Sequence, residues 1–127
     1  MSATADILVV EDDPTISRLL HDIFTLAGGS VRLAATADAA AASINEARPT
    51  LMTLDLNLPD QSGQALLERL RDQPELQELP VIVITSQLPI DHKVRAMAAA
   101  VVEKPFDLDE LLAAVSRVAP KTIRLAA

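Results

Sequence analysis

Residues 50–60 read TLMTLDLNLPD. The run from Leu51 to Leu54 is short and largely apolar, as expected for a strand that is buried on both faces. The carboxylate of Asp55 stands at the end of this strand, and Pro59 then turns the chain. A charge at the tip of an apolar run is costly unless a cation meets it there. The stretch therefore predicts a buried strand that ends in a charged site.

Similar apolar runs lie on both sides of this strand, and segments with helical periodicity separate them. The predicted strands cover residues 7–10, 31–34, 51–54, 81–84 and 101–102. The predicted helices cover residues 14–27, 38–47, 65–70, 89–100 and 108–118. Strands and helices that alternate through short connections predict an α/β fold, with a parallel sheet between two layers of helices.

Length and composition favour one globular domain over residues 1–127, with a core at about residues 6–119. Half of the residues are apolar, but only 2% are aromatic, so we expect an aliphatic core without stacking platforms for nucleic acid. The net charge of −7 also disfavours direct binding to a phosphate backbone. The chain has no cysteine, no recognisable signal peptide and no apolar run of about 20 residues. We expect a cytoplasmic protein without a membrane segment.

Polar side chains follow four of the predicted strands at the point where each strand ends. They are the pair Glu11 and Asp12, then Asp55, Thr85 and Lys104. The carboxyl ends of parallel strands share one edge of the sheet, where ligands bind near the switch in strand order. We therefore expect these side chains to converge.

Three carboxylates at one edge repel one another unless a cation separates them. Mg²⁺ suits such oxygen ligands, and Lys104 adds a point charge on a flexible stem. An aspartate beside a metal, a lysine and the hydroxyl of Thr85 has the equipment to accept a phosphoryl group.

At this point the chain resembles a known family, the receiver domains of two-component response regulators, over residues 6–119. The resemblance rests on ILVVEDD at 7–13, LDLNLPD at 54–60 with Gly63, VITS at 83–86 and KPF at 104–106. It implies a flavodoxin-like (βα)5 fold, a doubly wound five-stranded parallel sheet with strand order 2-1-3-4-5.

The resemblance also implies a magnesium site. Asp12 and Asp55 would bind Mg²⁺ directly, and the backbone carbonyl of Asn57 would complete the protein ligands. Glu11 would act mainly through water.

The same resemblance makes Asp55 the phosphoacceptor, with Thr85 and Lys104 binding the phosphoryl oxygens. Such a domain catalyses its own phosphorylation and dephosphorylation, but it is mainly a signalling switch. Asn57 and Gln87 would flank the phosphoryl group and tune its hydrolysis. The implied partners are a sensor histidine kinase or a histidine phosphotransfer protein and an unknown downstream protein, and the resemblance also allows a homodimer with a second copy. Whether the chain acts alone or as part of a longer protein stays open.

Two features depart from the family. Val101 stands three residues before Lys104, where the family usually has an aromatic switch residue. The segment 85–104 is also short, and Ala98 to Ala100 replace the usual Gly-Ala turn. We therefore expect a shortened fourth helix or an irregular exit from it.

Simpler readings apply to several residues. Asp13 is expected to cap the first helix, because Pro14 follows it, and Asp60 is expected to be a loop or cap carboxylate. His21 and His92 are read as surface residues.

Two other functions compete. A receiver-like interaction module that is not phosphorylated would use the same fold as a docking surface. A flavin- or nucleotide-binding protein is disfavoured, because an acidic segment stands where a Gly-rich phosphate loop would follow the first strand.

Overall fold

A five-stranded parallel sheet forms the centre of the computed structural model, which describes residues 5–118. The strands are β1 (Asp6–Val10), β2 (Ser30–Ala34), β3 (Leu51–Leu54), β4 (Val81–Thr85) and β5 (Ala100–Glu103). The helices are α1 (Pro14–Leu26), α2 (Ala37–Glu46), α3 (Gly63–Arg71), the 3₁₀ turn η1 (Pro74–Leu76), α4 (His92–Met97) and α5 (Leu108–Val118). The strand order is β2-β1-β3-β4-β5, which confirms the predicted fold class.

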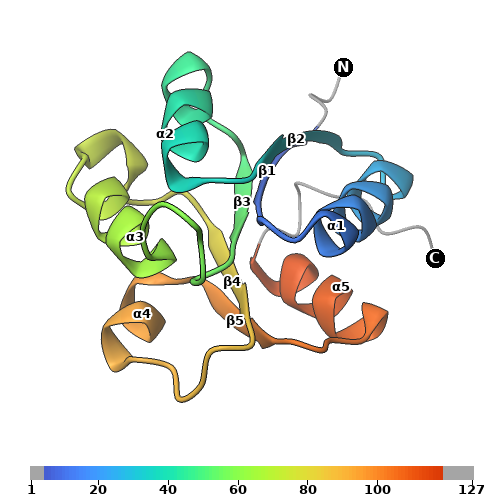
Figure 1. The fold of residues 1–127 in the computed structure, drawn as a ribbon. Coiled ribbons are helices and arrows are strands. Elements are labelled where there is room, and N and C mark those ends of the chain that lie inside the picture. Colours follow the sequence, from blue (N-terminus) through green and yellow to red (C-terminus); the bar gives the residue numbers. More distant parts are fainter. Residues whose placement is uncertain (1–4, 119–127) are drawn as a thin grey trace.

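Helices cover both faces of the sheet. Figure 1 shows α1 and α5 on one face, and α2, α3 and α4 on the other. Each face has its own buried cluster of mainly aliphatic side chains, and Phe24 of α1 is fully buried in the cluster that α1 and α5 cover. The strands β1, β3 and β4 lie inside the sheet and are almost entirely buried, which explains their continuous apolar runs.

Helix α1 begins and ends where the sequence predicts. The carboxylate of Asp13 accepts hydrogen bonds from the backbone N–H groups of Thr15 and Ile16, so Asp13 is the N-cap. Pro14 occupies the first helical position, where no backbone N–H is needed. After the helix, Gly28 adopts a φ of 94°, a left-handed conformation that favours glycine.

Helix α4 differs from the prediction at both ends. It was expected over residues 89–100, but it begins at His92 because the side chain of Asp91 caps it by accepting from Lys93 N. It ends at Met97, because Ala98 is extended and leads into β5. The expected shortening of this helix is thus confirmed, and Ala100 belongs to β5 instead.

The turn η1, which the sequence did not predict, follows α3 at Pro74. The last predicted helix, at residues 108–118, is confirmed as α5, whereas Pro120, which follows it, and the residues from Lys121 on lie outside the described residues. Within residues 5–118, no helix is both long enough and apolar enough to cross a membrane.

Candidate functional site

The strand register brings the polar tips of the strands together. Val10 lies opposite Leu54 in the ladder between β1 and β3, so the next residues, Glu11 and Asp55, are neighbours. Thr85 lies opposite Glu103 in the ladder between β4 and β5, so Lys104 follows at the same edge. This edge includes the gap between β1 and β3, where the strand order switches.

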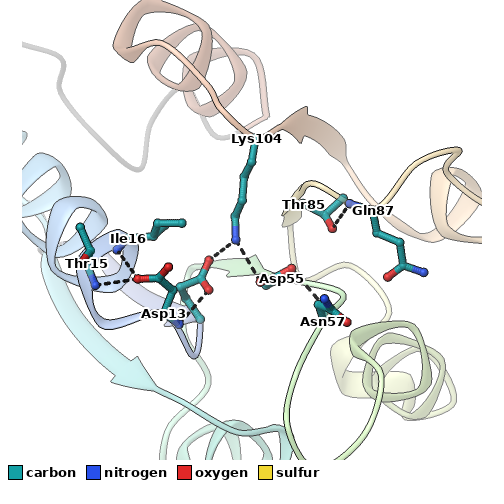
Figure 2. A network of polar contacts seen from close by, with 9 residues as sticks. Asp13, Thr15, Ile16, Asp55, Asn57, Thr85, Gln87 and Lys104 are labelled. Carbon is teal, nitrogen blue, oxygen red and sulfur yellow. Dashed lines mark hydrogen bonds and ion pairs between the residues drawn. The ribbon is translucent and has the colours of Figure 1, made fainter.

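Lys104 connects two of the three expected carboxylates. Its Nζ donates to Oε1 of Glu11 at 2.6 Å and to Oδ2 of Asp55 at 3.0 Å. Figure 2 shows Lys104 reaching from the end of β5 to the centre of the site at Asp55. Glu11 and Asp55 are 3% and 5% exposed, so these ion pairs are shielded from water. The expectation that a lysine meets the carboxylate of Asp55 is confirmed.

Burial and pairing act in opposite directions on the pKa values of this pair. Burial raises the pKa of Glu11 above its ordinary value, although hydrogen bonds from Lys104 and from the backbone of Asp13 partly offset the effect. Burial by itself would lower the pKa of Lys104, but hydrogen bonds to Glu11 and Asp55, together with the attraction of their charges, outweigh burial and raise the pKa. Lys104 is therefore firmly protonated at neutral pH.

The acidic residues form a group that fits a hard cation. Glu11, Asp12 and Asp55 each place one carboxylate oxygen within 4.8 Å of the others. Asp12 is exposed, and Oδ1 of Asp55 accepts from the backbone N–H of Asn57 at 3.1 Å. An oxygen-only donor set with one side open to water matches the preference of Mg²⁺, which retains several waters when it binds protein.

Thr85 lies fully buried at the end of β4. Its hydroxyl oxygen accepts a hydrogen bond from the backbone N–H of Gln87 at 3.0 Å, so its own O–H remains available as a donor. Figure 2 places Thr85 on one side of Asp55, with Lys104 coming from the other. The structure therefore brings Glu11, Asp12, Asp55, Thr85 and Lys104 to one edge, as the sequence predicts.

The histidines do not join this cluster. His92 has an exposed side chain, which agrees with a surface role. His21 is partly buried on α1, and its Nδ1 lies 3.1 Å from Oδ1 of Asp22.

Asp60 in the loop after Asp55 and Gly63 at the start of α3 have structural roles. Asp60 accepts hydrogen bonds from Ala37 N at 2.9 Å and Asp38 N at 3.0 Å, so the expectation of a loop or cap carboxylate is confirmed, and the helix that it caps is α2. Gly63 lies so close to β3 that a Cβ on it would overlap the carbonyl oxygen of Asp55. The signal for Asp60 was only its residue type, and the signal for Gly63 was indistinguishable from that of a turn glycine.

The sequence was compared with models of known protein families. The model of the response regulator receiver domain matches residues 7–116. The chain belongs to the response regulator receiver domain family.

Individual relatives of the receiver domain agree with this assignment. PhoB of Rhizobium meliloti, a phosphate regulon transcriptional regulatory protein, is 38% identical over 112 residues, covering 86% of the receiver domain and 49% of PhoB. Rrf1 of Nitratidesulfovibrio vulgaris is 34% identical over 113 residues, covering 89% of the receiver domain and 81% of Rrf1. The solved structure of the chemotaxis protein CheY4 of Vibrio cholerae has a TM-score of 0.83 at 28% identity, covering 91% of the receiver domain and 99% of that chain. The receiver domain spans about half the length of the first regulators that it matches, at 51%, 49% and 47%.

Proposed function

We propose that this receiver domain accepts a phosphoryl group on Asp55 in a Mg²⁺-dependent reaction and relays the signal by changing conformation. The observation that carries the proposal is the position of Asp55. Its carboxylate is buried at the strand edge, 3.0 Å from the cation of Lys104, and within 4.8 Å of two further carboxylates. Such an arrangement combines a nucleophile with groups that hold positive charge close to it.

The donor is a phosphohistidine on a sensor histidine kinase or a histidine phosphotransfer protein. A carboxylate oxygen of Asp55 attacks the phosphorus atom, and a P–O bond forms while the P–N bond breaks. The imidazole nitrogen keeps the electron pair of the broken bond and takes up a proton. Later, water attacks the aspartyl phosphate, which restores the carboxylate and releases inorganic phosphate.

The residues around Asp55 have separate tasks in this reaction. Asp12, Asp55 and the backbone carbonyl of Asn57 would hold Mg²⁺, with Glu11 acting through water. Bound Mg²⁺ supplies positive charge that offsets the repulsion between the carboxylates and the incoming phosphoryl oxygens. Lys104 already lies beside Asp55 and would bind one phosphoryl oxygen.

Thr85 would bind another phosphoryl oxygen through its hydroxyl. Phosphorylation adds a charge of about −1.5 to −2 at Asp55, and this charge attracts both the Thr85 hydroxyl and Lys104. Because Gln87 N donates to Thr85, a shift of Thr85 pulls on the segment that leads to α4. Val101 is half-buried and has no aromatic ring to reorient, so we infer that the signal leaves the site through this segment.

The expected partners follow from this chemistry. A phosphohistidine protein in the cytoplasm delivers the phosphoryl group, and a downstream protein reads the conformation near α4. Such a domain acts by itself or controls further domains, as the transcriptional regulators among its relatives suggest.

Mass spectrometry after incubation with Mg²⁺ and acetyl phosphate tests the proposal. We expect the wild-type protein to gain the mass of one phosphoryl group, and Asp55→Asn to gain none, because the amide is not a nucleophile under these conditions. Asp109→Asn is a matched control, because it removes an exposed carboxylate of α5 and keeps Asp55. Wild-type protein that stays unmodified with millimolar Mg²⁺ and excess donor would contradict the proposal and favour a non-phosphorylated interaction module.

A further inference from the structure

The loop that joins β3 to α3 carries Asn57 and is anchored at its base. Asn57 and Ser62 pair across the loop in an isolated antiparallel bridge. Just beyond, the backbone N–H of Gly63 donates to the carbonyl oxygen of Leu56 at 2.8 Å. These contacts close the loop next to Asp55, but they do not determine the direction in which its tip points.

The tip of the loop is tied to a different helix. Oδ1 of Asp60 accepts from Ala37 N at 2.9 Å, and Oδ2 accepts from Asp38 N at 3.0 Å. Both carboxylate oxygens are used, and the negative charge lies at the positive end of the α2 dipole. The two hydrogen bonds also lower the pKa of Asp60, so the carboxylate is ionised at neutral pH.

Helix α2 is a firm anchor for this loop. Its inner face, with Ala37, Ala40 and Ile44, is buried against the sheet. It also has a cap of its own, because Thr36 Oγ1 accepts from Ala39 N at 3.0 Å.

The side chain of Asp60 itself adds little packing. Asp60 is exposed, so its contribution comes from the two hydrogen bonds. Leu56 at the base of the loop is buried in the core, and Leu58 packs against the same cluster. These apolar contacts are not directional, whereas the bidentate carboxylate of Asp60 adds a directional contact beyond Leu58.

We propose that Asp60 is a positioning residue for the metal site, which holds the β3–α3 loop against α2 and so fixes the backbone carbonyl of Asn57. The inference rests on the proposed function, since it takes Asn57 as a ligand of Mg²⁺. Groups that orient metal ligands typically change metal affinity by about 10- to 100-fold when they are removed. Asp60 would act on only one carbonyl among several ligands, so we expect its removal to weaken metal binding by an amount at the lower end of that range.

The test compares Asp60→Ala with Thr36→Ala. Both variants remove a cap from the N-terminus of α2, but only Asp60→Ala also releases the loop. Isothermal titration with Mg²⁺ should show about tenfold weaker binding for Asp60→Ala, at the lower end of the usual range. Thr36→Ala should bind as the wild type does. Asp38→Asn controls for charge, because it removes an exposed carboxylate from the first turn of α2.

Hydrogen exchange in the metal-free proteins provides a second readout that does not depend on Mg²⁺. Peptides that cover residues 56–62 should exchange faster in Asp60→Ala and at the wild-type rate in Thr36→Ala. Faster exchange confined to the first turn of α2 in both variants would show that Asp60 is only a helix cap. Asp60→Asn keeps one acceptor oxygen and replaces Asp60→Ala in both measurements if the alanine variant does not fold.

The outcomes separate this inference from the proposed function. If the wild type fails to bind Mg²⁺, the proposed function is wrong, and the inference falls with it. If the wild type binds Mg²⁺ and Asp60→Ala binds equally well, the inference alone is overturned. Weaker binding by Asp38→Asn to the same degree would assign the effect to charge instead of loop position and would also overturn it.

Discussion

Lys104 is the residue on which the electrostatics of the site depend. Within residues 5–118, Lys104 is the cation that lies between Glu11 and Asp55. Both of these carboxylates are buried. Removal of one partner from a buried ion pair leaves an uncompensated charge, which typically costs about 3–5 kcal/mol. The side chain of Lys104 retains 12% exposure, so water can partly replace it.

Lys104→Met tests this balance while keeping most of the aliphatic stem. In the absence of metal, we expect the free energy of unfolding to fall by about 2–3 kcal/mol, somewhat below the typical cost for a fully buried pair. Mg²⁺ should bind at least as tightly as in the wild type, because a competing cation has been removed from Asp55. Urea denaturation with and without Mg²⁺ measures both effects, and added Mg²⁺ should recover most of the lost stability.

Lys93→Met is the matched control, since Lys93 is an exposed lysine of α4. It removes the same charge but should leave stability within about 0.5 kcal/mol, as is usual for surface substitutions. Markedly weaker Mg²⁺ binding by Lys104→Met would show that Lys104 supports the metal site instead of competing with the metal.

The start of α3 is pressed against the end of β3. Gly63 is buried, and the backbone of Asp55 and Leu56 fills the space that a side chain would need. Backbone atoms in a sheet move less readily than side chains, so a methyl group at this point would displace the strand end that carries Asp55.

Gly63→Ala should therefore lower the free energy of unfolding by about 3 kcal/mol, the upper end of the usual cost of overpacking. Gly29→Ala provides the contrast, because the first atom its Cβ would meet is Cδ1 of Ile7 at 2.9 Å, the end of a side chain, and the nearest backbone atom, Phe24 O, is 3.2 Å away. Its cost should be nearer 1 kcal/mol, the lower end of that range. Thermal denaturation of both variants checks the order, and equal costs would refute the importance of the close approach to β3.

The strands could be predicted from local sequence, and so could the helix caps that are adjacent in sequence to the helix they cap. The apolar runs of β1 and β4 and the cap at Asp13 depend on neighbouring residues, and the structure confirms them. The predicted bounds of α4 were wrong. Residues 89–100 have only a weak apolar pattern, and the start of the helix is set instead by the cap at Asp91. The contact of Asp60 with α2 spans more than 20 residues, so local patterns do not specify it.

The convergence of the site was predictable because it follows from topology. Parallel strands place every carboxyl end at one edge, so the type of residue after each strand was sufficient to bring Asp55 and Lys104 together. The pairing of Lys104 with Glu11 at 2.6 Å, shorter than its contact with Asp55, depends on side-chain packing that the sequence does not reveal.

The site connects segments that are distant in the chain. Glu11 and Lys104 are 93 positions apart, and Asp55 lies between them on a third strand. The cluster of carboxylates can therefore exist only when β1 and β3 are paired in the sheet, and its contact with Lys104 also requires β5. A ligand that binds this cluster binds the folded chain and not the unfolded one, so binding must stabilise the entire domain.

We therefore expect Mg²⁺ to raise the melting temperature of the wild-type protein. At a Mg²⁺ concentration of about ten times its Kd, linkage gives about 1.4 kcal/mol of stabilisation. For a domain of this size, that corresponds to a shift of roughly 4–8 °C. Asp12→Asn should lose most of the shift, because Asp12 is the exposed carboxylate of the cluster and is expected to bind the metal directly.

Differential scanning fluorimetry at constant ionic strength, with NaCl replacing MgCl₂, separates specific binding from general screening of the net charge of −7. An equal shift with NaCl, or an undiminished shift in Asp12→Asn, would contradict a Mg²⁺ site at this edge of the sheet.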